Sequence, residues 1–278
     1  MKKINRRSFL AAAGLTAAAL ALTACGGPPS STASSTASSA ASSEAASTSA
    51  AAELTTVEAG KLTMATNAAF PPYEMTTDAG EFEGIDIDTA KAIAEKLGLE
   101  LQIDDMDFDA ALLSVQQGKA DIVMAGVTVT DERKAVMDFS DSYATGIQSI
   151  IVPEGSDITS PDDLAGKKIG TQRGTTGYIY CSDDFGDDAV VAYDDGLTAV
   201  QALNNGQVDA VVIDNAPAKE FVAANPGLVI LDTSYAEEDY AIGLAKGSAL
   251  EDAVNATLEE LKADGTLQSI VDKYITAE

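Results

Sequence analysis

LQIDDMDFDAALLSVQQGKADIVMAGV, residues 101–127, decides the fold. It opens with a β-prone run, continues with helical apolar spacing through Phe108 and Leu112, and reaches a glycine at Gly118. Asp121 and an all-apolar run follow. A glycine after the last periodic residue is typical of a helix end. An all-apolar strand after a crossover helix predicts a parallel sheet that is covered on both faces.

A second stretch repeats this outline. Residues 190–215, VVAYDDGLTAVQALNNGQVDAVVIDN, place Gly206 and Asp209 as the first stretch places its glycine and aspartate. Upstream of each stretch, a predicted strand runs into a loop, at 61–66 before NAAFPPY and at 167–171 before QRGTTGY. The chain therefore holds two α/β units, each built around a parallel sheet.

The C-terminal segment indicates how the two units connect. Residues 248–263 and 266–275 have amphipathic helical spacing, and a β-prone run at 240–245 precedes them. If that run crosses back, the tail packs on the first unit and makes it discontinuous. The outward crossing then lies near 143–152, and two crossings form a double hinge.

The N-terminal sequence has the features of an export signal. Four cations precede a short apolar stretch, and LTAC at 22–25 resembles the lipobox of bacterial lipoproteins. That resemblance implies cleavage before Cys25 and a lipid on its thiol. Arg6-Arg7 resembles a twin-arginine signal, and the export route stays open. We expect these segments: 1–24 signal peptide; 25–57 lipidated cysteine and disordered Ser/Ala/Thr tether; 58–145 and 242–278 lobe 1; 146–241 lobe 2.

Composition excludes several classes of function. The chain has 17 Lys and Arg against 44 Asp and Glu, a net charge of −27, so it repels nucleic acid. It has no histidine, which excludes histidine triads and imidazole-ligated zinc. After processing only Cys181 would keep a free thiol, so no intramolecular disulfide is expected. We predict no catalytic residue, no metal and no cofactor.

A ligand site is predicted between the two units. Ligands of open parallel sheets bind outside the carboxyl ends of the strands. Those ends offer 67–70 and 125–128 in the first unit, and 173–177 and Asp214 in the second. Arg133 follows a predicted helix N-cap at Thr130, in a first turn where the helix dipole disfavours a cation. A cation and an anion on opposite sides of a cleft would clamp a zwitterion.

These residues resemble a known family. The segments are GIDIDTAKAIAEKLG (84–98), AGVTVTDERKAVMDFSDSY (125–143), DAVVIDN (209–215) and DGTLQSIVDKY (264–274). Together they resemble the polar amino acid-binding proteins of ABC importers, glutamine-binding members among them, from about residue 61 to 275. The resemblance implies an α/β fold of the type II periplasmic binding protein kind. Its two lobes would be mostly parallel sheets flanked by helices, joined by a double hinge, and would close over one amino acid.

The resemblance also implies roles for site residues. Arg133 would bind the α-carboxylate bidentately, together with the N–H groups of Thr128 and Thr176. Asp214, the carbonyl of Gly126 and the hydroxyl of Thr128 would bind the α-ammonium. Ala125 is small enough to let the ligand approach the backbone. The remaining expected contacts are Phe70 and Phe108 around the ligand side chain, Asn67 at its far end, and Thr175 in an anion-cradling loop.

Asn67 bears on the identity of the ligand. Aspartate often occupies this position in relatives that take basic amino acids, and a buried cation without a partner costs several kcal/mol. We therefore expect an uncharged, glutamine-like ligand. Basic amino acids remain the alternative, because Asp105, Asp107 and Asp109 flank Phe108. Gln172, where a glutamine-binding relative can have lysine, leaves the specificity open.

Other interpretations remain at this stage. Arg133 could pair with Asp138, and Asp214 could cap a helix that begins near Ala216-Pro217. The same fold also serves some dehydratases and amino-acid sensors. We expect a binding protein rather than an enzyme, a monomer held to the extracytoplasmic face of the cell membrane by lipid on Cys25. Its partners would be an amino acid and an ABC permease with its ATPase.

Overall fold

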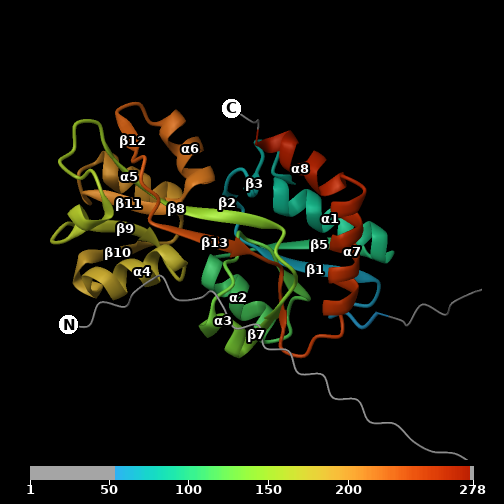
Figure 1. Ribbon diagram of the computed structural model, residues 1–278. Helices are drawn as coiled ribbons and strands as arrows, with labels where there is room; N and C mark the ends of the chain where they lie inside the picture. The colour runs from blue at the N-terminus through green and yellow to red at the C-terminus, as the bar shows by residue number, and fades with distance from the viewer. Residues whose placement is uncertain (1–53, 276–278) are drawn as a thin grey trace, which may run out of the picture. The chain divides into compact units, whose positions relative to one another are not determined.

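A computed structural model describes residues 54–275 (Figure 1). The expected signal peptide, Cys25 and most of the tether lie outside these residues. The first of two main sheets has the order β5-β1-β6-β14-β7. Strands β5, β1 and β6 are parallel, and β14 and β7 extend them through antiparallel pairs. Their bounds are β1 Lys61–Thr66, β5 Glu100–Asp105, β6 Ile122–Val123, β7 Met137–Phe139 and β14 Gly243–Ala245.

The second sheet has the order β10-β9-β11-β8-β12, with β13 also paired to β8. It too has a parallel core, β10-β9-β11, to which the other strands add antiparallel pairs. The prediction of two parallel sheets is therefore right for the central strands of each sheet, and the added strands are antiparallel. The bounds are β8 Ala144–Pro153, β9 Ile169–Gln172, β10 Val190–Tyr193, β11 Ala210–Asp214, β12 Leu228–Ile230 and β13 Ala236–Tyr240.

Helices cover both faces of each sheet (Figure 1). The bounds are α1 Ile85–Leu97, α2 Phe108–Gln116, α3 Asp131–Val136, α4 Thr176–Phe185, α5 Gly196–Asn204, α6 Asn215–Ala224, α7 Glu251–Ala263 and α8 Thr266–Tyr274. Two 3₁₀ helices, η1 Pro161–Leu164 and η2 Asp187–Ala189, lie in the second lobe. A small sheet, β2 Ala69–Phe70, β3 Glu74–Thr76 and β4 Phe82–Glu83, adjoins α1.

Each sheet has two separate hydrophobic cores, one on each face. In lobe 1, Leu62 and Met64 pack with α1, α7 and α8, whereas Ala65 and Val123 pack with α2. Fully burying a side chain such as Leu62, which is 0 % exposed, contributes about 1.5–3 kcal/mol. In lobe 2, one core packs under α5 and α6 and the other, around Cys181, under α4. The tail helices α7 and α8 pack against α1 of lobe 1.

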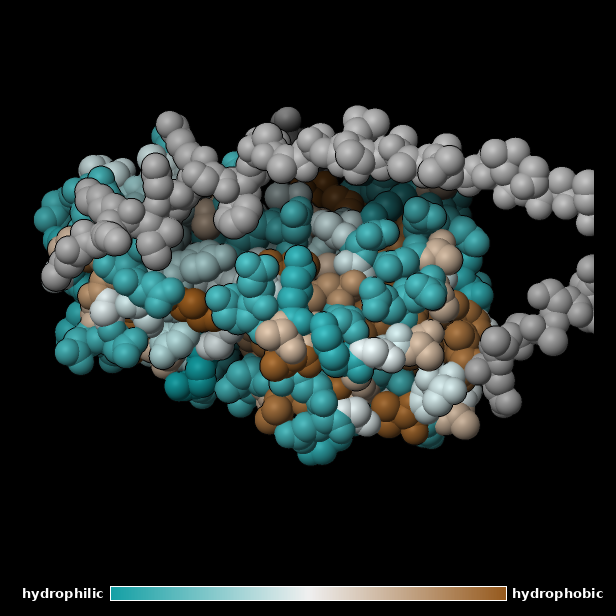
Figure 2. Space-filling model, turned by 60° about the horizontal axis from the view of Figure 1, so that its bottom comes forward, coloured by the Kyte–Doolittle hydropathy of each residue, from teal (hydrophilic) through white to brown (hydrophobic). Residues whose placement is uncertain are grey.

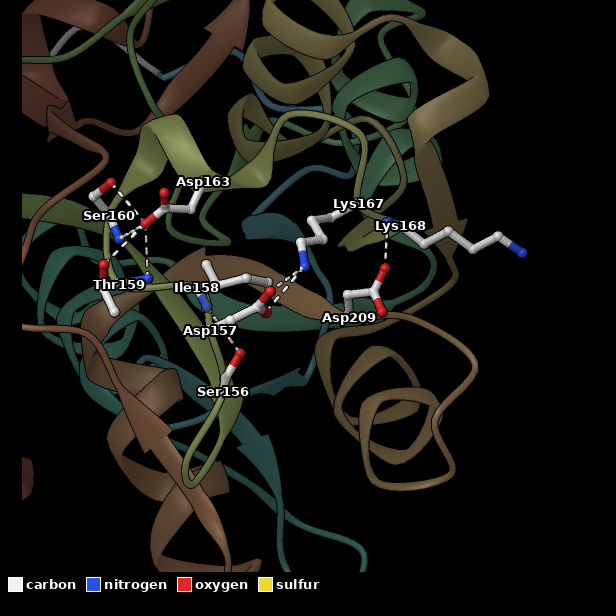
Figure 3. A network of polar contacts seen from close by, with 9 residues as sticks. All are labelled: Ser156, Asp157, Ile158, Thr159, Ser160, Asp163, Lys167, Lys168 and Asp209. Atoms are coloured by element: carbon white, nitrogen blue, oxygen red, sulfur yellow. Dashed lines mark hydrogen bonds and ion pairs between the residues drawn. The ribbon is translucent and has the colours of Figure 1, made fainter.

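The repeated aspartate has the same structural role in both lobes. Asp121 Oδ2 accepts a hydrogen bond of 2.8 Å from the main-chain N–H of Thr63. Asp209 Oδ2 likewise accepts one of 2.8 Å from the N–H of Lys168, as Figure 3 shows beside the Lys167–Asp157 ion pair. Each carboxylate thus joins the turn after a helix to the start of the neighbouring parallel strand. This explains why glycine and aspartate recur at one spacing.

Two antiparallel strands, β8 and β13, connect the lobes (Figure 1). β13 leads into lobe 1 through the bridge of Tyr240 to Thr128. A Cβ on Gly146 in β8 would overlap the ring of Tyr240, so a glycine is required where the strands cross. These are the two crossings that the sequence predicts near 143–152 and 240–245.

The visible surface is mostly polar. Figure 2 shows hydrophilic side chains over most of one face, with apolar side chains between them, in keeping with the acidic composition. Within residues 54–275, none of the helices combines the length and apolarity needed to cross a membrane.

Candidate functional site

One pocket lies at the carboxyl ends of β1, β6, β9 and β11. Its free volume is about 30 Å³, room for one or two water molecules, so the lobes must part to admit a larger ligand. Every site residue predicted from the sequence lines it: Asn67, Phe70, Phe108, Ala125, Gly126, Thr128, Arg133, Thr175, Thr176 and Asp214. Their contacts with a ligand remain a prediction.

Arg133 is the cation of the pocket. Its main-chain N–H donates to the Thr130 hydroxyl at 3.2 Å, so Thr130 is the N-cap of α3, as predicted. Its guanidinium donates to the carbonyls of Thr128, at 2.8 Å, and of Gly174 in lobe 2, at 3.2 Å. It lies 5.4 Å from the centre of the Phe108 ring. Burial lowers its pKa, and the largest opposing influence is the charge of Glu238.

The alternative partner of Arg133 is engaged elsewhere. Asp138 pairs with Lys246 at 2.6 Å and accepts a bond from the N–H of Gly247. Arg133 therefore holds two carbonyls with only part of its donor set, and a planar guanidinium has five N–H groups. The remaining donors suit a carboxylate that enters the pocket.

Asp214 is an anion of the pocket and also a helix cap. Its Oδ1 accepts the N–H of Ala216 at 2.9 Å, which caps α6 as the alternative interpretation holds. Its Oδ2 accepts the N–H of Ile147 at 2.8 Å. Burial raises the pKa of Asp214 to about 6, partly offset by its hydrogen bonds with Ala216 and Tyr240. At neutral pH it is mostly ionised, and a neighbouring ammonium would stabilise that state.

The loop at Gly126 is held by an acid that the sequence reasoning did not place in the site. Gly126 has φ +55°, and its N–H donates to Asp86 Oδ2 at 3.0 Å. Tyr143 Oη donates to the other oxygen at 2.7 Å. Asp86 is the first aspartate of the GIDID motif. Its buried carboxylate therefore fixes the backbone that faces the pocket.

Glu74 is a further buried acid that the sequence reasoning missed. It lines the pocket and is 0 % exposed, and no donor among residues 54–275 reaches either carboxyl oxygen. Burial, followed by the charge of Asp86, raises its pKa well above the usual value. Burial therefore favours the protonated form of this carboxyl group. The only sequence signal was its place directly after FPPY.

Amide and aromatic side chains line the pocket, and one pair of amides joins the two lobes. Gln172 Nε2 of lobe 2 donates to Asn67 Oδ1 of lobe 1 at 2.8 Å, and Asn67 Nδ2 donates to the carbonyl of Met106 at 2.9 Å. Phe70 stacks on Tyr73 with ring centres 5.9 Å apart. Gln148, Tyr240, Val212 and Ile213 complete the lining. These last four belong to crossing strands and a buried strand, where sequence alone does not separate pocket from core.

Comparison with known proteins identifies the family. The model of the family "Bacterial extracellular solute-binding proteins, family 3" matches residues 62–277. The chain belongs to this family. The relatives found are substrate-binding proteins of ABC transporters and not enzymes, so the dehydratase interpretation is not supported. The two-lobed fold is that of the type II periplasmic binding proteins.

Two curated relatives illustrate the similarity of this solute-binding protein to others in sequence. A probable histidine-binding protein of Neisseria gonorrhoeae is 32% identical over 283 residues, 99% of this chain and 98% of the relative. An ABC transporter glutamine-binding protein of Bacillus subtilis (strain 168) is 35% identical over 202 residues, 71% of this chain and 74% of the relative.

Solved structures show the same fold. An ancestral arginine-binding protein bound to arginine has a TM-score of 0.74 and 43% identity, covering 78% of this chain and 98% of that one. An ancestral arginine-binding protein bound to glutamine has a TM-score of 0.75 and 42% identity, covering 78% and 99%. Thus this chain is similar to proteins whose ligands carry charged and uncharged side chains.

Proposed function

We propose that this solute-binding protein captures one polar amino acid by closing its lobes and delivers it to an ABC importer. One observation carries the proposal. A buried arginine from lobe 1 and a buried aspartate from lobe 2, Arg133 and Asp214, line the same pocket and have donors or acceptors left for a ligand. A ligand that bridges both binds the closed state better than the open one, and this differential affinity shifts the population.

The proposed contacts follow from charge. The α-carboxylate pairs with Arg133 and with the N–H groups of Thr128 and Thr176, the latter in the first turn of α4, where the helix dipole favours an anion. The α-ammonium pairs with Asp214, the carbonyl of Gly126 and the hydroxyl of Thr128. A dissociation constant near 1 μM corresponds to about −8 kcal/mol. Two buried charge pairs and aromatic packing are sufficient for that.

We favour an uncharged side chain, glutamine-like. Phe70 and Phe108 line the pocket, where aromatic rings can pack on a planar group, and the polar groups of Asn67 and Gln172 are neutral amides. Burial and the charge of Asp86 raise the pKa of Glu74, the further acid of the lining, and so favour its uncharged form. An uncharged amide leaves no buried cation without a partner.

Basic amino acids are the second candidate, and Glu74 is the observation in their favour. A buried acid without a hydrogen-bond donor would gain most from a ligand that supplies one. A guanidinium near Glu74 would lower its pKa and pair with the resulting carboxylate. Several relatives are named for arginine, among them the arginine-binding extracellular protein ArtP of Bacillus subtilis (strain 168).

A thermal-shift panel of the twenty L-amino acids tests the proposal. Glutamine should raise the melting temperature most if the uncharged side chain is right, and arginine, lysine or histidine if the second candidate is right. 5-Guanidinopentanoic acid and agmatine, which lack the α-amino and the α-carboxyl group of arginine, serve as controls with an intact side chain. A panel in which no amino acid shifts the wild-type melting temperature would refute the proposal.

The membrane anchor is a separate proposal. Cys25 would carry the lipid that keeps this acidic protein at the extracytoplasmic membrane surface, near a permease and its ATPase. The support is the LTAC sequence at 22–25, which lies outside the described residues. Metabolic labelling with a radioactive fatty acid should label the wild-type protein and not Cys25→Ser. Equal labelling of both would exclude this cysteine.

A further inference from the structure

Beneath the pocket, one carboxylate oxygen collects three hydrogen bonds. Glu238 Oε2 accepts from the hydroxyl of Thr128, from the hydroxyl of Thr176 and from the side-chain amide of Gln148, each at 3.0 Å. All four residues are buried, with exposed fractions between 2% and 6%. Glu238 does not itself line the pocket, whereas its three donors do. It therefore acts on the site through them.

The three donors come from separate parts of the fold. Thr128 follows β6 in lobe 1, and Thr176 begins α4 in lobe 2. Gln148 and Glu238 belong to the two crossing strands, β8 and β13. One oxygen atom thus joins lobe 1, lobe 2 and the hinge. Glu74, Asp86 and Asp214, the other acids around the pocket, make no such connection through the bonds described for them.

This geometry has two physical consequences. A threonine hydroxyl has a single proton, and here both protons point to Glu238. Toward a ligand, the oxygens of Thr128 and Thr176 are therefore acceptors, suited to an ammonium. The two hydroxyl oxygens are only 3.5 Å apart, so any parting of the lobes breaks at least one bond to Glu238. A buried carboxylate that loses a donor is destabilised, because hydrogen bonds to charged groups are among the strong ones.

Glu238 also lies close enough to Arg133 to stabilise its charge. When the lobes are closed, the cleft thus holds an internal anion that opposes the buried guanidinium, in addition to the three hydrogen bonds. The three hydrogen bonds favour closure, and they fix groups that a ligand would contact.

We propose that Glu238 is a positioning residue that couples ligand binding to lobe closure by holding one threonine hydroxyl from each lobe. It orients both hydroxyls as acceptors, and the closed arrangement is the one in which its Oε2 keeps all three donors. The proposal rests on the proposed function, since it assumes that the pocket binds an amino acid. Glu238 would thus contribute to the ligand affinity without touching the ligand.

The chain offers a matched control. Glu237 precedes Glu238 on β13 and is exposed, so Glu237→Gln makes the same chemical change on the same strand. We would measure the affinities of L-glutamine and L-arginine by calorimetry for wild type, Glu238→Gln, Glu237→Gln, Thr176→Val and the double variant Glu238→Gln/Thr176→Val. For the better-bound probe, Glu238→Gln should weaken binding at least tenfold, about 1.4 kcal/mol. Glu237→Gln should change it less than twofold.

Two readouts separate positioning from a merely structural effect. Thr176→Val should weaken binding in the wild-type background but less than twofold further beside Glu238→Gln, because groups that act as a unit are not additive. In the absence of ligand, Glu238→Gln should speed hydrogen exchange of segments 125–130 and 172–178, and Glu237→Gln should not. The proposal would be overturned if Glu238→Gln bound the ligand as tightly as Glu237→Gln does. It would also be overturned if the affinity losses of Glu238→Gln and Thr176→Val were additive and hydrogen exchange were unchanged.

A folding defect leaves the test intact. If Glu238→Gln does not fold, Glu238→Asp keeps the charge but is one methylene too short to hold both hydroxyls. It should lose three- to tenfold in affinity, and wild-type affinity would overturn the proposal. If wild type binds neither probe, the proposed function fails, and the exchange experiment without ligand still decides whether Glu238 holds the lobes together.

Discussion

Replacement of Arg133 by alanine is the most direct perturbation of the proposed site. The guanidinium makes two hydrogen bonds to carbonyls in the absence of ligand, and its other donors would form a bidentate pair with the ligand carboxylate. Each hydrogen bond to a charged group contributes about 1.5–3 kcal/mol. Loss of two such bonds weakens binding by about 3–6 kcal/mol, or roughly 10²- to 10⁴-fold. A micromolar ligand would then bind only at about millimolar concentrations.

The fold should survive this change. Arg133 is a buried cation whose pKa is lowered by desolvation, so its removal relieves a cost of burial. The carbonyls of Thr128 and Gly174 lose a donor, but Thr128 lines the pocket and the bond to Gly174 is only partly buried, so water can replace the donor at each. We expect a change in the free energy of unfolding within about 2 kcal/mol. Circular dichroism during thermal unfolding measures it.

The assay is calorimetric titration with the amino acid that gives the largest thermal shift. Arg173→Ala is the matched control, because Arg173 is half exposed, lies one residue from Gly174 and pairs with Asp194 at 3.6 Å on the surface. Exposed pairs of this kind contribute about 0–1 kcal/mol, so the control should bind as wild type does. If Arg133→Ala keeps its affinity within threefold of the control, the carboxylate is not bound by Arg133 and the assignment is wrong.

Three further changes test other parts of the site. Asn67→Asp puts an anion where a neutral amide now pairs with Gln172, so the affinity ratio of L-arginine to L-glutamine should rise at least tenfold, and an unchanged ratio would remove Asn67 from the specificity determinants. Ligand affinity should fall by up to about tenfold per pH unit below pH 6, since Asp214 has a pKa of about 6 and binds an ammonium only when ionised. Asp86, Glu238, Tyr73 and Tyr240 surround the same site, so the control is Asp214→Asn. A flat affinity profile below pH 6 in wild type, or an equally steep one in Asp214→Asn, would exclude Asp214 as the titrating group. Gly126→Ala should lower the unfolding free energy and weaken binding, because its Cβ would lie 2.9 Å from the Phe70 ring at φ +55°. Gly118→Ala is the control: its φ is +65° and the space around its Cβ is open, so it loses stability through backbone strain alone, about 1–2 kcal/mol. Equal ligand affinities of the two variants would mean that Gly126 does not face the ligand.

Asp214 is a residue for which the sequence suggested two competing roles and the structure shows that both are possible at once. The sequence indicated two roles for Asp214: a cap of the helix that begins near Ala216-Pro217, and a ligand contact at the end of a buried strand. These two roles looked like alternatives. In the structure one oxygen caps α6 and the other accepts from Ile147 of the crossing strand, while the residue also lines the pocket. A carboxylate has two oxygens, so the two roles coexist.

The sequence by itself determined the two α/β units, and it predicted the return of the tail to lobe 1 and the place of the pocket. These follow from local rules: apolar periodicity, glycine at helix ends, and ligand binding at the carboxyl ends of parallel strands. Only the tertiary structure revealed Glu74, Asp86 and Glu238, three acids from β3, α1 and β13 whose meaning comes from what surrounds them. Burial, pKa and hydrogen-bond partners are set by residues distant in the chain, and no local pattern records them.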